Sequence, residues 1–238
     1  MTVSAPQVPT GTIPGQVATL RLSPLSDLAA DFEAATVTGP GGVRLRELPF
    51  LAQVNLRVDP DDRPALQRIA AAFGAELPTR PNTVATAGIR QLFWLGPDEW
   101  LVIGPDHDAH WIERALRSAL GEPDPGARGF GSVVNVSAGR TVLELSGPAA
   151  RELLEKGCAL DLHPLAFRPG QCAQTLVSRA EVILHQTADT PDTATYRLLV
   201  RNSFARYLAI WLLDAMQEYR YAGLDEHGLV ERGLEELG

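Results

Sequence analysis

Apolar and polar residues alternate over residues 51–58, and this spacing predicts a half-buried strand. The next two residues, Asp59 and Pro60, predict the start of a helix with the aspartate as N-cap. Four apolar residues at helical spacing give this helix a buried face: Leu66, Ile69, Ala70 and Phe73. The first half then continues with two strands and closes on a helix, over 89–95, 99–103 and 108–120.

The second half repeats this order of elements. Two strands are predicted over 132–136 and 141–145, and the Ser-Gly-Pro sequence at 146–148 predicts the start of a helix that ends at Gly157. Three more strands and a last helix follow, over 172–177, 181–184, 195–200 and 203–218. A helix–strand–strand–helix order used twice predicts an α+β fold with two similar halves, in which helices cover antiparallel or mixed sheets.

The last helix is apolar on more than one side. Five residues share a face that we expect to be buried: Phe204, Tyr207, Leu208, Trp211 and Ala215. Ile210 and Leu213 point the other way, among polar residues. They are either scattered surface residues, which are common, or part of a subunit contact. The spacing alone does not separate these two explanations.

The two ends differ in composition from the middle. Residues 1–20 are rich in Pro, Gly, Thr and Ala, and we expect a flexible arm. Residues 220–238 form an acidic tail that three glycines interrupt, so we expect a frayed helix or disorder, with an acidic docking segment as the alternative. Residues 21–219 are expected to form the folded domain.

Charge and cysteine content exclude several classes of partner. Lys and Arg number 21 against 29 Asp and Glu, which gives a net charge of −8 and disfavours nucleic acids and anionic membranes. Two cysteines cannot form a disulfide framework, and this indicates a reducing, cytoplasmic location. The N-terminus lacks the features of a signal peptide, and the apolar run at 208–213 is too short to span a bilayer.

Several segments resemble the gamma subunit of heterotetrameric sarcosine oxidase. The first three are LPFLAQVNLRVDP at 48–60, LGPDEWLVIGP at 95–105 and VVNVSAGRTVLELSGPAARELLEKGCALDLHPLAF at 133–167. The others are GQCAQTLVSRAEVIL at 170–184 and RLLVRNSFARYLAIWLLDA at 197–215. The resemblance extends from about residue 25 to about residue 220. The same segments are similar to the folate-binding domain of the glycine-cleavage aminomethyltransferase.

This resemblance implies a small non-catalytic subunit that helps to assemble a larger complex. In that family the complex oxidatively demethylates sarcosine to glycine, releases hydrogen peroxide and passes the one-carbon unit to tetrahydrofolate. The implied partners are alpha, beta and delta subunits, which would carry FAD, FMN, NAD, zinc and tetrahydrofolate, with no cofactor on this chain. One alternative is a stand-alone folate-binding or aminomethyltransferase-like protein. Another is a regulatory module that acts through the acidic tail.

No residue is assigned to a catalytic, cofactor-binding or metal site. A folate-transferring enzyme needs a carboxylate beside the pterin and the amine, and Asp161 is the only carboxylate in the region 160–163. We expect Asp161 to cap a helix or close a turn instead. Four residues are potential zinc ligands but lack the close spacing of a zinc site: Cys158, His163, Cys172 and His185. His107 and His110 flank a helix start, where exposed residues of the first turn are the expected explanation.

Nucleotide and nucleophile motifs are incomplete. The glycines at 126, 129 and 131 do not form GxGxxG, and no P-loop sequence occurs. Ser146 lacks the GxSxG context, and we expect its hydroxyl to start a helix. Three arginines near the last helix could bind an anion, but we expect surface charges that pair with Asp214 and Glu218: Arg201, Arg206 and Arg220.

Overall fold

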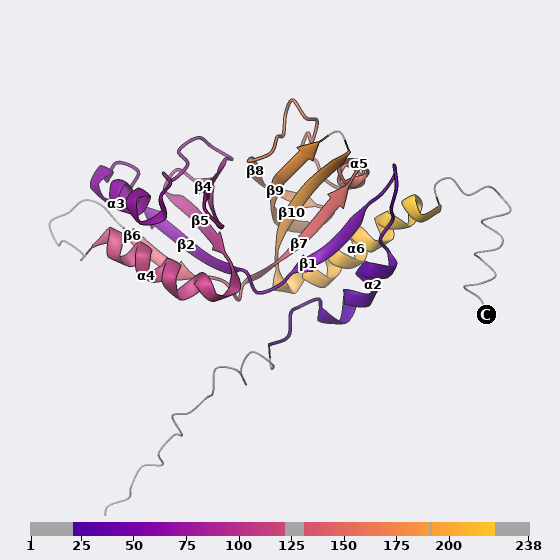
Figure 1. The fold of residues 1–238 in the computed structure, drawn as a ribbon, viewed down its shortest axis with the longest axis horizontal. Coiled ribbons are helices and arrows are strands. Elements are labelled where there is room, and N and C mark those ends of the chain that lie inside the picture. Colours follow the sequence, from indigo (N-terminus) through magenta and orange to yellow (C-terminus); the bar gives the residue numbers. More distant parts are fainter. Residues whose placement is uncertain (1–20, 122–130, 191, 222–238) are drawn as a thin grey trace, which may run out of the picture.

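The computed structural model describes residues 21–121, 131–190 and 192–221. Their strands form two five-stranded sheets in which all neighbours are antiparallel. Helices cover the outer face of each sheet (Figure 1). The predicted α+β class with two similar halves is therefore confirmed.

The first sheet has the order β3-β4-β5-β2-β6. Alternate residues of its strands pack against two helices and form one core. Its strands are β2 (Ala52–Val58), β3 (Val84–Ala87), β4 (Arg90–Gly96), β5 (Glu99–Gly104) and β6 (Gly131–Asn135). Its helices are α3 (Arg63–Phe73) and α4 (Ala109–Leu120), the latter preceded by the short 3-10 helix η2 (Asp106–Asp108).

The second sheet has the order β1-β7-β10-β9-β8 and a core of its own under three helices. Its strands are β1 (Arg44–Leu48), β7 (Arg140–Gly147), β8 (Cys172–Val177), β9 (Ala180–Thr190) and β10 (Thr193–Arg201). The helices are α2 (Ala29–Ala34), α5 (Ala150–Glu155) and α6 (Asn202–Tyr221), with the 3-10 helix η1 (Ser26–Leu28) before α2.

The two halves exchange a strand. β1 directly precedes β2 in the chain, yet it pairs with β7 of the other sheet. β6 directly precedes β7, yet it pairs with β2. Counted from β2 and from β7, the remaining strands occupy equivalent positions, and α4 in the first half corresponds to α6 in the second. Because each sheet contains a strand next to the other half in sequence, neither sheet is complete without the other.

The inner faces of the two sheets pack against each other. A third buried cluster joins Phe93, Leu101 and Ile103 of the first sheet to residues of the second. On β7 the alternation is clear, because Leu143 and Leu145 belong to the helix-side core while Val142 faces the first sheet. The fold thus has four layers, with helices outside and the two sheets inside (Figure 1).

The start of α3 differs from the prediction. Asp62, rather than Asp59, is the N-cap, and its carboxylate accepts a hydrogen bond from the Ala65 amide at 3.0 Å. Asp59 instead accepts a bond from the Asp61 amide, which closes the turn before the helix. Three aspartates within residues 59–62 offer several caps, and Pro64 favours the last of them because proline fits the first helical turn.

The Ser-Gly-Pro sequence at 146–148 also has a different role from the predicted one. Ser146 and Gly147 are the last residues of β7, and α5 starts at Ala150 without a side-chain cap. Gly147 has a φ of 130°, and a Cβ placed there would lie 2.3 Å from the carbonyl oxygen of Gly42. The glycine is needed because the 39–42 loop crosses the end of β7 at this point.

The buried face of α6 is rotated relative to the prediction. Leu208 is buried as expected, but Phe204 and Tyr207 are 44% and 39% exposed. The residues that face the sheet include two alanines, which allow a close approach: Ala205, Leu208, Ala209, Leu212, Met216 and Tyr219. Trp211 and Ala215 are partly buried against the same core, so the predicted face overlaps the buried one but is turned toward the exposed Phe204 and Tyr207.

The predicted ends lie mostly outside the described residues. Residues 1–20 of the expected arm are not described, and nor are residues 222–238 of the expected tail. Arg220 and Tyr221 belong to α6. No helix in the described part of the chain is long and apolar enough to cross a membrane.

We predict that Gly147→Ala lowers the free energy of unfolding by about 2–5 kcal/mol, because the new methyl group meets the Gly42 carbonyl and the positive φ becomes strained. Urea denaturation followed by circular dichroism measures this. The matched control is Gly41→Ala, where no atom lies within 4 Å of the new Cβ, and its change should stay below about 1 kcal/mol. Equal stability of the two variants would show that the crossing is not tight.

Candidate functional site

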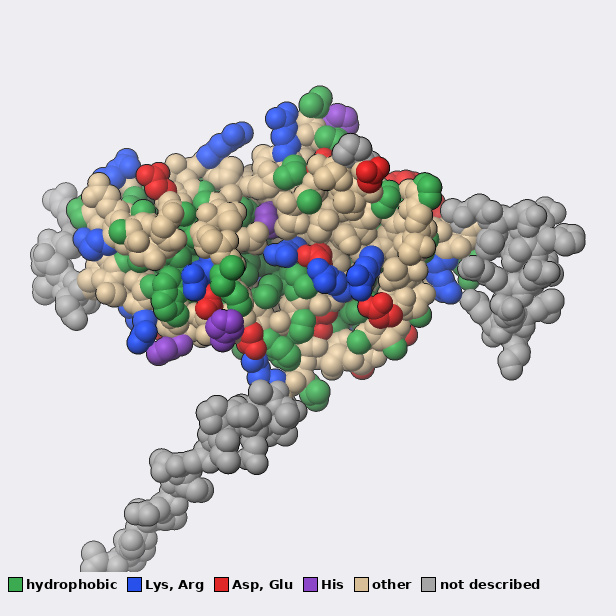
Figure 2. Space-filling model, in the orientation of Figure 1, with side chains coloured by type: hydrophobic (Ala, Val, Ile, Leu, Met, Phe, Trp, Pro, Cys, Tyr) green, Lys and Arg blue, Asp and Glu red, His purple; other side chains and the backbone are tan. Residues whose placement is uncertain are grey.

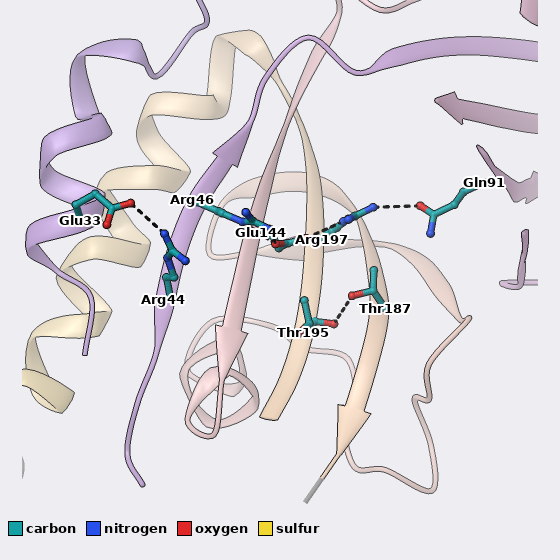
Figure 3. Close-up of polar contacts among 8 residues, drawn as sticks. All are labelled: Glu33, Arg44, Arg46, Gln91, Glu144, Thr187, Thr195 and Arg197. Carbon is teal, nitrogen blue, oxygen red and sulfur yellow. Dashed lines mark hydrogen bonds and ion pairs between the residues drawn. The ribbon is translucent and has the colours of Figure 1, made fainter. Parts of the chain in front are cut away.

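Four polar side chains meet on the inner side of the sheets, and they come from both halves of the molecule (Figure 3). Arg46 on β1 donates from Nε to Glu144 Oε1 at 2.8 Å, and Arg197 on β10 donates from Nε to Glu144 Oε2 at 3.0 Å. Arg197 also donates to the Gln91 side chain of β4 at 3.4 Å. We call this set (Arg46, Gln91, Glu144 and Arg197) the central polar cluster.

Glu144 is the buried centre of this cluster, with 6% of its surface exposed. Burial acts to raise the pKa of its carboxyl group, but the hydrogen bonds from Arg46 and Arg197 outweigh burial and hold the pKa below its ordinary value. The group is therefore ionised at neutral pH, and both oxygens already accept bonds. Such a carboxylate stabilises the sheet contact and is poorly suited to take a proton from a substrate.

Basic and acidic side chains adjoin one another along the middle of the molecule, between the two halves (Figure 2). Glu47 on β1 lies on the other face of the second sheet, on the side of Leu143, and accepts hydrogen bonds from the hydroxyl groups of Ser23 and Thr141, both at 2.5 Å. The carboxylates of Glu144 and Glu47 are thus both bound by other side chains of this chain.

Cys172 and His185 are the sequence-predicted candidates that the structure brings together. They are register partners on β8 and β9, and both are buried. Burial raises the pKa of the Cys172 thiol to about 12, and burial together with Arg197 lowers the pKa of His185 to about 4. The His185 ring also contacts the Phe93 ring edge to face, at 4.9 Å between centroids. A nucleophilic cysteine needs a lowered thiol pKa so that the thiolate forms, and its base needs a pKa near neutral so that it can accept the proton. Here burial raises the thiol pKa of Cys172 and lowers the pKa of His185, so both shifts disfavour nucleophilic catalysis.

The other two zinc-ligand candidates lie elsewhere. Cys158 belongs to the helix-side core of the second sheet. His163 is exposed, and its Nδ1 accepts a bond from the Leu165 amide at 3.2 Å. Over the described ranges, no group of three or more His, Cys, Asp or Glu residues is placed to hold a metal ion. The four residues therefore do not form a common site.

Asp161 closes a turn, as predicted, because its carboxylate accepts a bond from the His163 amide at 2.9 Å. His107 and His110 are both exposed, which agrees with the expectation for the first turn of a helix. Asp108 between them is buried and forms an ion pair with Arg90 at 2.8 Å. That ion pair was not predicted, because Arg90 lies 18 positions earlier in the sequence.

The partners of two of the three arginines were predicted wrongly. Arg201 lies 3.9 Å from Glu181, and Arg206 pairs with Asp27. Arg220 donates to Gln217 at 3.4 Å. The acid expected to pair with them at position 218 binds Lys156 instead, at 2.5 Å. Of the glycines considered for a nucleotide loop, those at 126 and 129 lie outside the described residues, and the one at 131 begins β6.

Sequence reasoning missed an apolar cavity of about 510 Å³ beside α3. Trp94 and Trp100 line it together with leucine, alanine and proline side chains, and Arg63 and Glu76 are its ionisable residues. Gln67 and Thr79 are its other polar residues, and no Ser, Cys or His lines the cavity, so it offers mainly an apolar binding surface. Trp94 and Trp100, which flank the Gly-Pro-Asp turn, are the sequence feature that could have indicated this cavity.

We predict that Glu144→Gln lowers the free energy of unfolding by about 1–3 kcal/mol at pH 7, because two arginines lose a charged partner. The Glu144 pKa is lower in the folded chain than in the unfolded chain, so the stabilisation is complete above an unfolded pKa of about 4.3 and is lost as the pH falls through the folded pKa. Denaturation at pH 7 and below pH 4 measures both effects.

The matched control for this variant is Glu33→Gln. Glu33 pairs with Arg44 at 3.2 Å, but its side chain is 69% exposed, so the expected change is below about 1 kcal/mol (Figure 3). An equal effect of the two substitutions would contradict the structural role of the central polar cluster.

We also predict that iodoacetamide leaves the native chain unmodified at pH 8, because both cysteines are buried and the Cys172 thiol has a pKa of about 12. Mass spectrometry should detect alkylation only after unfolding in guanidinium. Rapid labelling of Cys172 in the native protein would mean that the thiol is reactive after all.

The family model described as "Sarcosine oxidase, gamma subunit family" matches residues 57–218. A sarcosine oxidase gamma subunit from Corynebacterium sp. (strain U-96) is 39% identical over 205 residues, covering 85% of this chain and 93% of the relative. A second gamma subunit, from Arthrobacter sp., is 38% identical over 202 residues and covers 84% and 92%.

Two solved structures are similar to this chain. A chain of the heterotetrameric sarcosine oxidase from Corynebacterium sp. U-96, in complex with pyrrole 2-carboxylate, matches with a TM-score of 0.76 and 37% identity, covering 87% of this chain and all of that one. Aminomethyltransferase T from Bartonella henselae matches with a TM-score of 0.55 and 14% identity, covering 80% of this chain and 56% of that one, which supports the predicted fold alone. By the extent and identity of these matches, the chain belongs to the sarcosine oxidase gamma subunit family.

Proposed function

We propose that this chain is a small assembly subunit of a heterotetrameric sarcosine oxidase and carries no catalytic site of its own. The observation that supports this most strongly is the chemical state of its polar residues. Glu144 is fully bound by arginines, and the buried Cys172 and His185 have pKa values shifted away from catalytic use. A family member built in this way contributes surface and rigidity to its complex.

The chemistry of the complex then lies on its partners. We propose that alpha, beta and delta subunits bind FAD, FMN, NAD, zinc and tetrahydrofolate and demethylate sarcosine to glycine, with release of hydrogen peroxide. The solved relative is described as a heterotetrameric sarcosine oxidase, which supports the heteromeric assembly. A net charge of −8 and two unpaired buried thiols fit a cytoplasmic complex without nucleic-acid or membrane partners.

The alternative is a stand-alone folate-binding or aminomethyltransferase-like protein. The similarity to aminomethyltransferase T concerns the fold, and a shared fold does not determine function. The apolar cavity beside α3 is large enough for a small molecule, but it offers no acid–base pair for a transfer reaction.

We predict that co-expression with the three other subunits yields a complex that contains this chain and oxidises sarcosine, whereas the isolated chain is inactive. Omission of this chain should lower the yield and the thermal stability of the complex. Recovery of a fully assembled complex of normal stability in its absence would count against the assembly role. In calorimetry with tetrahydrofolate, the isolated chain should show no micromolar binding, and such binding would favour the alternative.

A further inference from the structure

Helix α6 carries exposed apolar residues along one side. Phe204, Tyr207 and Ile210 are 44%, 39% and 49% exposed, and the half-buried Trp211 lies beside them at helical spacing. We call these four residues the α6 stripe. Phe204, Tyr207 and Ile210 point away from the buried face of α6, whereas part of Trp211 packs against the core of the second sheet. Three neighbouring exposed hydrophobic residues on one helix form a patch of the kind that contacts partners.

Two aromatic residues of the α6 stripe are held in place. The Tyr207 hydroxyl lies 2.7 Å from the Ser178 hydroxyl, which fixes the ring against the β8–β9 turn. The Trp211 ring lies against Gly157, where an added Cβ would be 2.5 Å from the ring. Fixed aromatic side chains lose little conformational freedom when a partner covers them, and Tyr and Trp are enriched among the residues that dominate binding energy.

The first half of the molecule shows that the fold itself does not require an apolar outer face here. Helix α4 occupies the position that corresponds to α6. Its exposed residues include His110, Arg114, Arg117 and Ser118, and Arg117 forms an ion pair with Glu113 at 2.8 Å. The exposed side of α4 is thus polar, whereas the exposed side of α6 includes three large hydrophobic residues among polar ones, so the difference reflects a role outside the fold.

Charge argues for a different chain as the occupant. Two copies of this protein would repel each other, since each chain has a net charge of −8 and each would place Asp214 at the shared contact. Asp214 lies about one turn beyond Ile210 and Trp211 on the same side of α6 and is exposed, and the described part of the structure gives it no ion-pair or hydrogen-bond partner. A basic side chain on the partner would complement it.

We infer that the α6 stripe docks onto an apolar surface with a basic rim on another subunit of the complex. This inference rests on the proposed assembly function and adds the surface that carries it. Ile210 and Trp211 form the centre of the contact, and Asp214 forms its charged edge.

The test is co-purification of full-length chains co-expressed with the alpha, beta and delta subunits. Ile210→Glu should reduce the recovered complex by about tenfold or more, because it places a charge in the centre of the contact. The matched control is Ile89→Glu, an equally drastic change at an isoleucine that is 69% exposed and lies off the stripe, and recovery should be unchanged. Asp214→Lys should weaken recovery by about three- to tenfold through charge repulsion.

The outcomes are separable. If the wild-type chain fails to co-purify, the assembly function itself is wrong. If it co-purifies and Ile210→Glu co-purifies equally well, the docking surface lies elsewhere. Thermal melting of each purified variant shows whether it is folded, and Phe204→Glu repeats the test if Ile210→Glu is unfolded. A dimer of the isolated chain that Ile210→Glu abolishes in light scattering would assign the stripe to self-association and overturn the inference.

Discussion

The exchange of β1 and β6 between the sheets is the constraint on which the rest of the structure depends. β1 pairs along its whole length with β7, from Arg44 opposite Ser146 to Leu48 opposite Val142. Each sheet therefore needs a strand that is adjacent in sequence to the other half, and the two sheets must form together. Their inner faces then pack as a third core. This arrangement joins the two similar halves through exchanged strands and a shared core.

The same exchange determines where the charges lie. Arg46 reaches Glu144 because β1 is next to β7, and Arg197 joins them from β10 on the other side. Gln91 then links the cluster to the first sheet. Because both oxygens of the Glu144 carboxylate accept hydrogen bonds, this network holds the neighbouring strands and sheets in position and leaves the carboxylate unavailable to a ligand. Glu144, Cys172 and His185 are therefore buried, and the outer helices provide surface that a partner can contact.

Much of the fold was predictable from the sequence, and the failures have identifiable causes. Periodicity located most strands and the long helices, but β1 (Arg44–Leu48) was missed because it is short and its alternation breaks at Glu47, a charged residue on the same face as the buried Leu45. Glu47 fits there because the hydroxyl groups of Ser23 and Thr141 bind it, and the spacing of residues in the sequence does not reveal these partners. Cys172 and His185 were both considered, yet only the register of β8 and β9 shows that they are neighbours. The face of α6 was misjudged because the close-packed side is set by alanines.

The most direct test of the central claim is the turnover of sarcosine per assembled complex. The measurement compares complexes that contain the wild-type chain with complexes that contain a chain carrying His185→Gln and Cys172→Ser, after size-exclusion chromatography has equalised the amount of intact assembly. An account in which this chain provides structure and docking surface predicts the same turnover number for both. A fall of about tenfold or more in intact complexes would show that residues of this chain take part in the chemistry.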